Sequence, residues 1–229
     1  MSAPSIRARV RAEMTDEIKA VARRHLATDG ANLSLRAVAR DMGMVSSALY
    51  RYFPSRDELL TALIIDAYNA LGEAIERAEA SVSRNDLRGR WLAACRGVRE
   101  WALANPAEYA LIYGSPVPGY AAPQDTIGPA QRPPVVLMAI LADGLASGTL
   151  TADPGDWLPE PLRAEARNVA DLAFPGLPEG TLSRGMTGWI QLFGVVSFEL
   201  FGRFNNAINE RAAYFEQQMR LMADLIGLP

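Results

Sequence analysis

The chain has 229 residues, 49% of them hydrophobic, which is enough to bury the core of one large domain or two small ones. A net charge of −3 excludes a strongly basic nucleic-acid binder, and a single cysteine and a single histidine exclude a disulfide framework or a paired Cys/His metal site. No apolar run reaches about 18 residues and the N-terminus lacks an apolar core, so we expect no membrane span, no signal peptide and a cytoplasmic protein.

The charge is unevenly distributed along the chain. Residues 1–60 hold ten Arg and Lys against seven Asp and Glu, whereas residues 61–229 hold thirteen against nineteen. A basic head and an acidic body fit a protein that binds DNA at one end, although chance clustering can give a difference of this size. At the start of the head, Arg7, Arg9 and Arg11 form either a basic arm on DNA or a solvated tail that continues into the first helix.

An amphipathic helix is predicted after this arm. Gly30 is its expected C-cap, because glycine takes a left-handed backbone without steric cost. The lone histidine, His25, lies near the end of this helix, where we interpret it as a rim residue rather than a ligand or a base. The apolar stripe of the helix consists of Met14, Ile18, Val21, Ala22 and Leu26.

Two short helices joined by a tight turn are predicted next. Ser34 is a good N-cap for the first of them, and Gly43 stands where that helix must stop and the chain must reverse. The second helix begins near Ser46 and places Leu49 and Phe53 four residues apart, so that both side chains face inward.

A further helix begins directly after Pro54, which ends the second helix. Ser55 and Glu58 stand three residues apart and form a capping box for this new helix. The whole pattern is typical of a helix-turn-helix, whose second helix enters the major groove of DNA. From the pattern alone, an ordinary helical hairpin in an all-α protein is equally compatible.

The exposed face of the second helix has the residue types that groove entry requires. Ser46, Ser47 and Ala48 are small, so the backbone can approach the base edges closely. Phosphate contacts need hydrogen-bond donors around the rim of this face. The candidate donors are Arg36, Tyr50, Arg51, Tyr52 and Arg56.

The order Leu-Tyr-Arg-Tyr-Phe at 49–53, followed by Arg56, resembles the signature of the tetracycline-repressor (TetR) family of bacterial regulators. The resemblance covers residues 43–60 and has departures. Val45 stands where the family often has serine, so it lacks a hydroxyl for phosphate; Tyr52 replaces a frequent histidine, and an arginine at 56 replaces the usual lysine. The DNA-binding residues that the resemblance and the pattern together imply are Ser34, Arg36, Val45, Ser46, Ser47, Ala48, Tyr50, Arg51, Tyr52 and Arg56.

The rest of the chain is also predicted to be helical. A long loop with six prolines is expected over 114–134, and two proline-bearing connections over 151–162 and 174–181. Cys95 lies among apolar residues and is interpreted as a small core residue. The predicted helices span residues 56–80, 87–104, 106–113, 135–148, 163–172, 184–205 and 211–228.

The last two predicted helices are apolar almost all round. Such helices expose more apolar surface than one body can cover, which favours pairing with the same two helices of a second chain in a four-helix bundle; the alternative is a monomer core. The residues predicted to form the dimer interface are Phe193, Val196, Leu200, Phe204, Phe215, Met219 and Met222.

Aromatic residues and methionine recur through the body and suggest a cavity for an apolar effector with a few hydroxyl donors, although side chains of this kind are more often plain core. The stretches 101–113, with Gly119 and Tyr120, and 188–194 resemble a WHG-like subgroup of TetR-type C-terminal domains. The residues predicted to line the pocket are Trp101, Tyr109, Tyr113, Tyr120, Met138 and Trp189.

The sequence therefore predicts an all-α protein with a helix-turn-helix DNA-binding domain over 1–55 and a helical effector-binding and dimerisation domain over 56–229. No catalytic constellation, metal site or cofactor-binding motif is expected. The predicted function is a homodimeric transcriptional regulator, a repressor that leaves a palindromic operator when a small apolar ligand binds. The resemblance implies that the helix from 56 connects head and body and sets the distance between two heads. The alternatives are a helical small-molecule carrier or enzyme with a head that only resembles a DNA reader, and a DNA-binding protein that needs no ligand.

Overall fold

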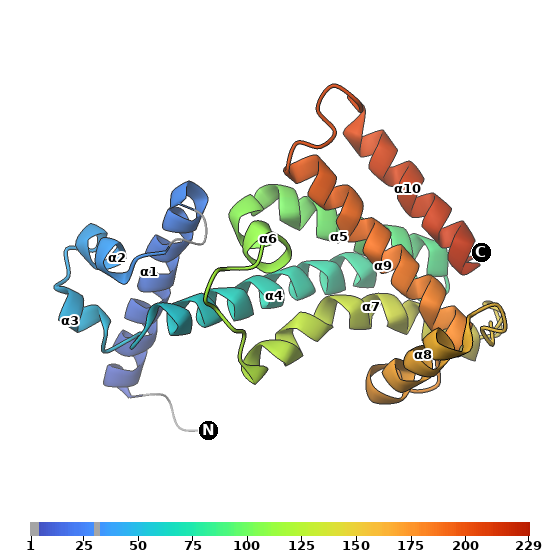
Figure 1. The fold of residues 1–229 in the computed structure, drawn as a ribbon, viewed down its shortest axis with the longest axis horizontal. Helices are drawn as coiled ribbons and strands as arrows, with labels where there is room; N and C mark the ends of the chain where they lie inside the picture. The colour runs from blue at the N-terminus through green and yellow to red at the C-terminus, as the bar shows by residue number, and fades with distance from the viewer. Residues whose placement is uncertain (1–4, 30–32) are drawn as a thin grey trace. The chain divides into compact units, whose positions relative to one another are not determined.

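The computed structural model describes residues 5–29 and 33–229, and within these ranges the regular secondary structure is all helix, with no strand (Figure 1). The prediction of an all-α protein is confirmed. The elements are α1 (Ile6–Asp29), α2 (Leu35–Asp41), α3 (Ser46–Leu49), α4 (Arg56–Ala80), α5 (Leu87–Ala104), α6 (Pro106–Tyr113), the 3₁₀ helix η1 (Gln124–Thr126), α7 (Ile127–Ala146), α8 (Glu160–Ala173), α9 (Glu179–Leu200) and α10 (Arg211–Ile226).

The chain divides into two compact units, each made of two segments. Unit 1 comprises residues 1–69 and 105–130, and unit 2 comprises residues 70–104 and 131–229. The boundaries therefore fall inside α4 and inside α7. The predicted division between a DNA-binding domain over 1–55 and a second domain over 56–229 differs from these structural units. It stays a prediction about function.

Unit 1 is built around one apolar core to which each of its first four helices contributes. Ile18 of α1, Val38 of α2, Leu49 of α3 and Leu60 of α4 are fully buried there. The α1 stripe predicted from the sequence thus faces the core. The second segment of the unit covers the same core with Ala107, Leu111, Val117 and Tyr120.

Ion pairs fasten α1 to α4 within unit 1. The Asp66 carboxylate accepts from Lys19 Nζ at 2.9 Å and from Arg23 Nη2 at 2.6 Å. Two residues beyond Arg23 on α1, His25 Nε2 lies 2.7 Å from the Asp41 carboxylate of α2. His25 is therefore at the rim of the head, as predicted. The predicted C-cap of this helix, Gly30, lies outside the described residues.

Unit 2 is organised by α5 and α9, which pack against α10. Trp91 of α5 is fully buried, and its indole Nε1 donates to the Met219 carbonyl of α10 at 3.1 Å. A Cβ on Gly188 of α9 would lie 2.8 Å from the Trp91 ring, so glycine is needed for this approach. Cys95 is fully buried nearby in α5, which confirms its prediction as a core residue.

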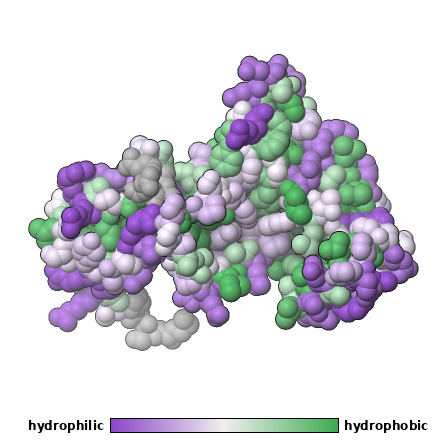
Figure 2. All heavy atoms as spheres, in the orientation of Figure 1, coloured by the Kyte–Doolittle hydropathy of each residue, from purple (hydrophilic) through white to green (hydrophobic). Residues whose placement is uncertain are grey.

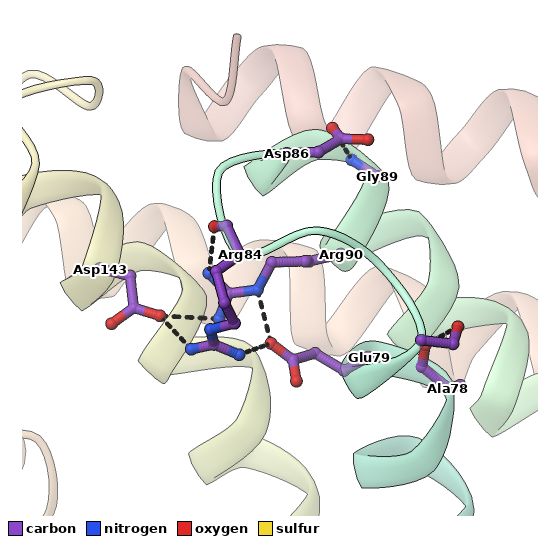
Figure 3. A network of polar contacts seen from close by, with 8 residues as sticks. Ala78, Glu79, Arg84, Asp86, Gly89, Arg90 and Asp143 are labelled. Atoms are coloured by element: carbon purple, nitrogen blue, oxygen red, sulfur yellow. Dashed lines mark hydrogen bonds and ion pairs between the residues drawn. The ribbon is translucent and has the colours of Figure 1, made fainter.

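A network of charges with buried Arg90 and Glu79 at its centre and exposed Arg84 and Asp143 at its edge joins α4, α5 and α7 in unit 2 (Figure 3). Arg90, whose side chain is 1% exposed, donates to Glu79 at 2.5 Å and to Asp143 at 2.7 Å. Arg84 pairs with the same two carboxylates at 2.6 Å and 2.5 Å. Two cations and two anions thus balance where the end of α4 meets the turn into α5.

The structure corrects the predicted loop over 114–134. The 3₁₀ helix η1 and α7 occupy its second half, and α7 continues through Pro133 and Pro134. Pro129 falls in the first turn of α7, where its missing N–H has no intrahelical partner in any case. The two later prolines each remove one backbone hydrogen bond, and the burial of apolar residues such as Leu137 on α7 offsets that loss.

Other helix ends also differ from the prediction. The helix expected over 184–205 is α9, which begins at Glu179 and ends at Leu200; Gly202 has φ +71 and the Arg203 N–H bonds to the Phe198 carbonyl, which closes the helix in a left-handed C-terminal turn. The helix α8 begins three residues earlier than expected, directly after Pro159. The second helix of the head, expected to reach residue 53, is regular only to Leu49 and continues as turns.

Candidate nucleic-acid interface

The turn between α2 and α3 is fixed by local backbone geometry. Ser34 caps α2, since its Oγ accepts from the Ala37 N–H at 3.4 Å. Gly43 has φ +66, and the Met44 N–H bonds back to the Ala39 carbonyl at 2.9 Å. This left-handed turn is the one that the glycine predicted.

The helix α3 presents small side chains to solvent and anchors itself through its opposite face. Leu49 is fully buried, and Phe53 beyond the helix is 6% exposed. Ser47 is exposed, while Ser46 and Ala48 are half-buried. The three small residues are therefore not enclosed by the core, and a duplex can reach this face of α3.

The two ends of α3 carry larger exposed side chains. Val45 directly precedes the helix and is 70% exposed, while Tyr50 directly follows it and is 41% exposed. Ser34 and Arg36, at the start of α2, are also exposed. These residues were all predicted to contact DNA, and all of them reach the surface of unit 1.

The remaining predicted donors are placed around the C-terminal end of α3. Arg51 is exposed, and Tyr52 is half-buried beneath the guanidinium of Arg11, whose Cζ lies 5.2 Å from the ring centroid. The Arg56 side chain is 33% exposed and lies 3.6 Å from the Asp57 carboxylate. Ser55 caps α4 as predicted, since its Oγ accepts from the Glu58 N–H at 3.1 Å, which is the serine half of the predicted capping box.

Arg11 belongs to this region, although the sequence pattern placed it only in a basic arm. Its Nη2 donates to the Arg51 carbonyl at 3.0 Å, in addition to the contact with the Tyr52 ring. The described part of the expected arm is helical, because α1 begins at Ile6. Helical spacing from Met14 back to residue 7 would have shown that Arg11 shares a face with core-directed residues.

The aromatic residues predicted to line a pocket fall in both units. In unit 1, the rings of Tyr109 and Tyr113 lie 5.2 Å apart, and Tyr68 meets Tyr113 edge-on at 6.0 Å. The Tyr120 hydroxyl lies 2.9 Å from Thr61 Oγ1 of α4. Burial, together with the neighbouring phenols, raises the pKa of Tyr113, so its hydroxyl stays protonated and neutral.

The other predicted pocket residues belong to unit 2. Met138 of α7 is 2% exposed and packs closely against Gly185 of α9. The rings of Trp189 and Phe193 lie 4.2 Å apart on α9, and Trp101 is half-buried near the end of α5. A pocket formed by all six predicted residues stays a prediction.

The residues predicted for the dimer interface are mostly covered within one chain. Phe193, Val196, Phe204, Phe215 and Met219 are each at most 8% exposed, and Leu200 and Met222 are half-buried. The five covered side chains pack within their own unit, whereas Leu200 and Met222 remain partly exposed, and the predicted interface stays a prediction.

The exposed apolar surface of the same two helices is made by a different set of residues. Met186 and Ile190 lie one turn apart on the side of α9 opposite its buried face and are 41% and 65% exposed, and Phe201, directly after the helix, is 45% exposed. Figure 2 shows hydrophobic residues reaching the surface over α9 and α10. The exposed apolar residues of this surface, here called the α9–α10 face, are Met186, Ile190, Phe198, Phe201, Leu221 and Leu225.

Among the described residues, no cluster of three or more His, Cys, Asp or Glu side chains could hold a metal ion. The helices described are all too short or too polar to cross a membrane.

Two family profiles match the chain. Residues 18–63 match the profile of bacterial regulatory proteins of the tetR family, and residues 91–222 match a tetracyclin repressor-like C-terminal domain. The first match covers α2, α3 and the turn between them, and the second covers most of unit 2.

Relatives of the same kind match nearly the whole chain. The HTH-type transcriptional regulators Rv1816 of Mycobacterium tuberculosis and Mb1846 of Mycobacterium bovis are each 38% identical over 221 residues, covering 95% of this chain and 94% of the relative. The crystal structure of the regulatory protein SCO4313 matches with a TM-score of 0.80 at 35% identity, covering 97% of this chain and 100% of that one. The regulator PfmR of Thermus thermophilus shares the fold, with a TM-score of 0.58 at 19% identity.

Proposed function

The chain belongs to the tetR family of bacterial regulatory proteins and is a transcriptional regulator, and we propose that it represses its target genes by binding a palindromic operator as a homodimer. The observation that carries this proposal is the accessible face of α3, with Ser46, Ser47 and Ala48 outside the core while Leu49 is fully buried. A one-turn helix held in this way can enter the major groove with its backbone close to the bases.

Phosphate contacts are assigned to the donors that surround this face. Arg36 of α2 and Arg51, which follows α3 in the chain, are both exposed. Tyr50, directly after α3, is 41% exposed. Arg56, at the start of α4, is partly exposed and supplies a further cation. Cations bound to phosphates release counterions, so operator binding is expected to weaken steeply as the salt concentration rises.

The homodimer is proposed to form through the α9–α10 face. Its six exposed apolar residues form a surface that one chain leaves uncovered, and burial against a second copy would remove them from water. DNA readers with two-fold symmetry bind half-sites about 34–36 Å apart, and we propose that this homodimer reads a palindromic operator in the same way.

Release by a small apolar ligand is the regulatory part of the proposal. The predicted lining residues are aromatic or methionine, and Tyr113 and Tyr120 add hydroxyl groups. A ligand shifts the protein between conformations only if it binds one of them more tightly. We accordingly place the protein in the cytoplasm, where both its DNA and its ligand would be accessible.

The DNA-binding assignment is tested by anisotropy titrations with labelled duplexes from the region upstream of its own gene, over a series of salt concentrations. Replacing Tyr50 or Arg56 by alanine is expected to weaken operator binding about tenfold, and Arg56→Ala should also lower the salt slope by about one. The matched control is Arg220→Ala on α10, whose side chain pairs with Glu216 in unit 2. Full operator affinity in both Tyr50→Ala and Arg56→Ala would refute these assignments.

The ligand assignment is tested by a thermal-shift screen of small apolar compounds against the intact protein. A true effector is expected to raise the midpoint of unfolding and to weaken operator binding, and Tyr113→Ala should remove both effects. A compound that binds in the body but leaves operator affinity unchanged would argue for a DNA-binding protein without ligand control.

A further inference from the structure

The helix α3 is too short to be stable by itself. It spans four residues, Ser46–Leu49, and its N-cap residue Val45 makes no side-chain capping bond. A single turn of helix has an unfavourable nucleation free energy, so its position must be set by contacts from outside. Leu49 and Phe53 anchor the inner face, but burial of apolar groups is non-directional and does not orient the turns that follow.

Arg11 of α1 supplies a directional contact at the C-terminal end of α3. Its guanidinium Nη2 donates to the Arg51 carbonyl at 3.0 Å, across 40 positions of sequence. The same guanidinium lies 5.2 Å from the centroid of the Tyr52 ring. A cation at the end of a helix is favoured by the backbone dipole, and a planar guanidinium can donate a hydrogen bond while it stacks on a ring.

We propose that Arg11 is a positioning residue for DNA recognition, which acts through Tyr52 and the Arg51 carbonyl to hold the end of α3 in its DNA-binding orientation. This inference rests on the proposed function, because it concerns how the same surface engages an operator. It assigns Arg11 a role distinct from that of a cation that simply touches a phosphate.

The expected size of the effect follows from the two contacts. A cation–π contact and a charge-assisted hydrogen bond at an exposed site together bias the local orientation by about three- to tenfold. Without the contacts, the fraction of molecules that present α3 in the DNA-binding orientation falls by up to this factor. The apparent operator affinity falls in proportion to that fraction. Lysine at this position keeps the charge but has no planar fork, so it should recover only part of the loss.

The test uses the full-length protein and a duplex that the wild type selects from a random-sequence pool. Anisotropy titrations compare Arg11→Ala, Arg11→Lys, Tyr52→Leu and the double variant Arg11→Ala/Tyr52→Leu. We expect Arg11→Ala to weaken binding about three- to tenfold with an unchanged salt slope, and we expect most of this loss to disappear in the Tyr52→Leu background. The matched control is Arg9→Ala, since Arg9 lies on the same helix with its side chain 66% exposed.

Several results would overturn the inference. Arg11→Ala could bind like the wild type, or could lower the salt slope by about one with the same loss in both backgrounds, which is the behaviour of a direct phosphate contact. Stoichiometric titrations measure the fraction of each variant that can bind DNA. If a smaller binding-competent fraction accounts for the whole loss of operator affinity in Arg11→Ala, the role of Arg11 is purely structural. If Arg11→Ala does not fold, the same cycle built with Arg11→Lys decides the question. Failure of the wild type to select any duplex would instead refute the proposed function.

Discussion

Arg90 is the most deeply buried charged side chain among the described residues, and it is held by Glu79 and Asp143. Removing Arg90 leaves the nearly buried Glu79 carboxylate paired only with Arg84, whose side chain is 62% exposed, so we expect Arg90→Leu to lower the free energy of unfolding by about 3 kcal/mol. The double variant Arg90→Leu/Glu79→Leu should recover most of that loss. Urea unfolding followed by circular dichroism measures both.

The control for this prediction is Arg220→Ala, which removes an exposed i,i+4 pair on α10. Such surface pairs contribute about 0.3–0.5 kcal/mol, so this variant should stay close to the wild type. Equal effects of the Arg90 and Arg220 substitutions would contradict the view that burial makes the network important.

The Arg96–Glu216 pair, which joins α5 to α10, predicts a pH dependence of stability. Arg96 donates to the Glu216 carboxylate at 2.9 Å and 2.5 Å, and these hydrogen bonds lower the pKa of Glu216 below its usual 4.5. A folded-state pKa below the unfolded value adds stability above about pH 4.5, and that stability is lost as the pH falls through the folded-state pKa.

Glu216→Gln should therefore be less stable than the wild type at neutral pH, and the difference should shrink as the pH falls below about 4.5. Denaturant unfolding at a series of pH values measures it. A difference that stays constant with pH would mean that the carboxylate charge has no part in the effect.

At the scale of elements, the turn between α2 and α3 depends on one backbone conformation. Gly43 has φ +66, and the position that a Cβ would take there is open to at least 4 Å, so an alanine is strained by its backbone and not by crowding. We expect Gly43→Ala to destabilise the protein by about 1 kcal/mol and to weaken operator binding. Thermal unfolding and anisotropy titration check the two effects.

Gly128→Ala is the matched control for this substitution. Gly128 lies in α7 in ordinary helical backbone and also has open space around its Cβ position, so alanine there should leave stability unchanged or raise it. If both alanines behaved alike, backbone conformation would not be the cause.

Much of the helix-turn-helix was predictable from sequence, because its signals are local. Ser34 and Ser55 as caps and Gly43 as the turn residue each act within three or four positions. The helix boundaries of α4, α5 and α6 also agree with the prediction, since polar breaks or prolines mark them.

The misjudged elements depend on contacts between distant segments. Prolines predicted a loop up to residue 134, but the apolar face of α7 stabilises a helix through two of them. The apolar pattern of α9 predicted burial on several sides, but it could not tell which side packs against its own chain. Phe193 and Ile190 look alike in sequence, and only packing shows that one is 8% exposed and the other 65%.

At the scale of the whole molecule, the α9–α10 face predicts the oligomeric state. Ile190→Glu places a charge among the exposed apolar residues of this face, so we expect it to convert the proposed dimer into a monomer and to abolish operator binding. Leu172→Glu on α8 is the control, because its side chain is 87% exposed and lies outside this face. Analytical ultracentrifugation measures the oligomeric state of both variants. A dimeric Ile190→Glu variant would place the interface elsewhere.

The two-segment construction of unit 1 has a consequence for how such regulators are recombined. Residues 105–130 contribute Ala107, Leu111, Val117 and Tyr120 to the cover of the core that α1 to α4 build. A chimaera that exchanges only residues 1–69 would therefore pack the new N-terminal helices against residues 105–130 of a different protein. Operator specificity should be exchangeable between two relatives when both segments of unit 1 are replaced at once. It should also be exchangeable when only the solvent-facing residues of α3 are replaced.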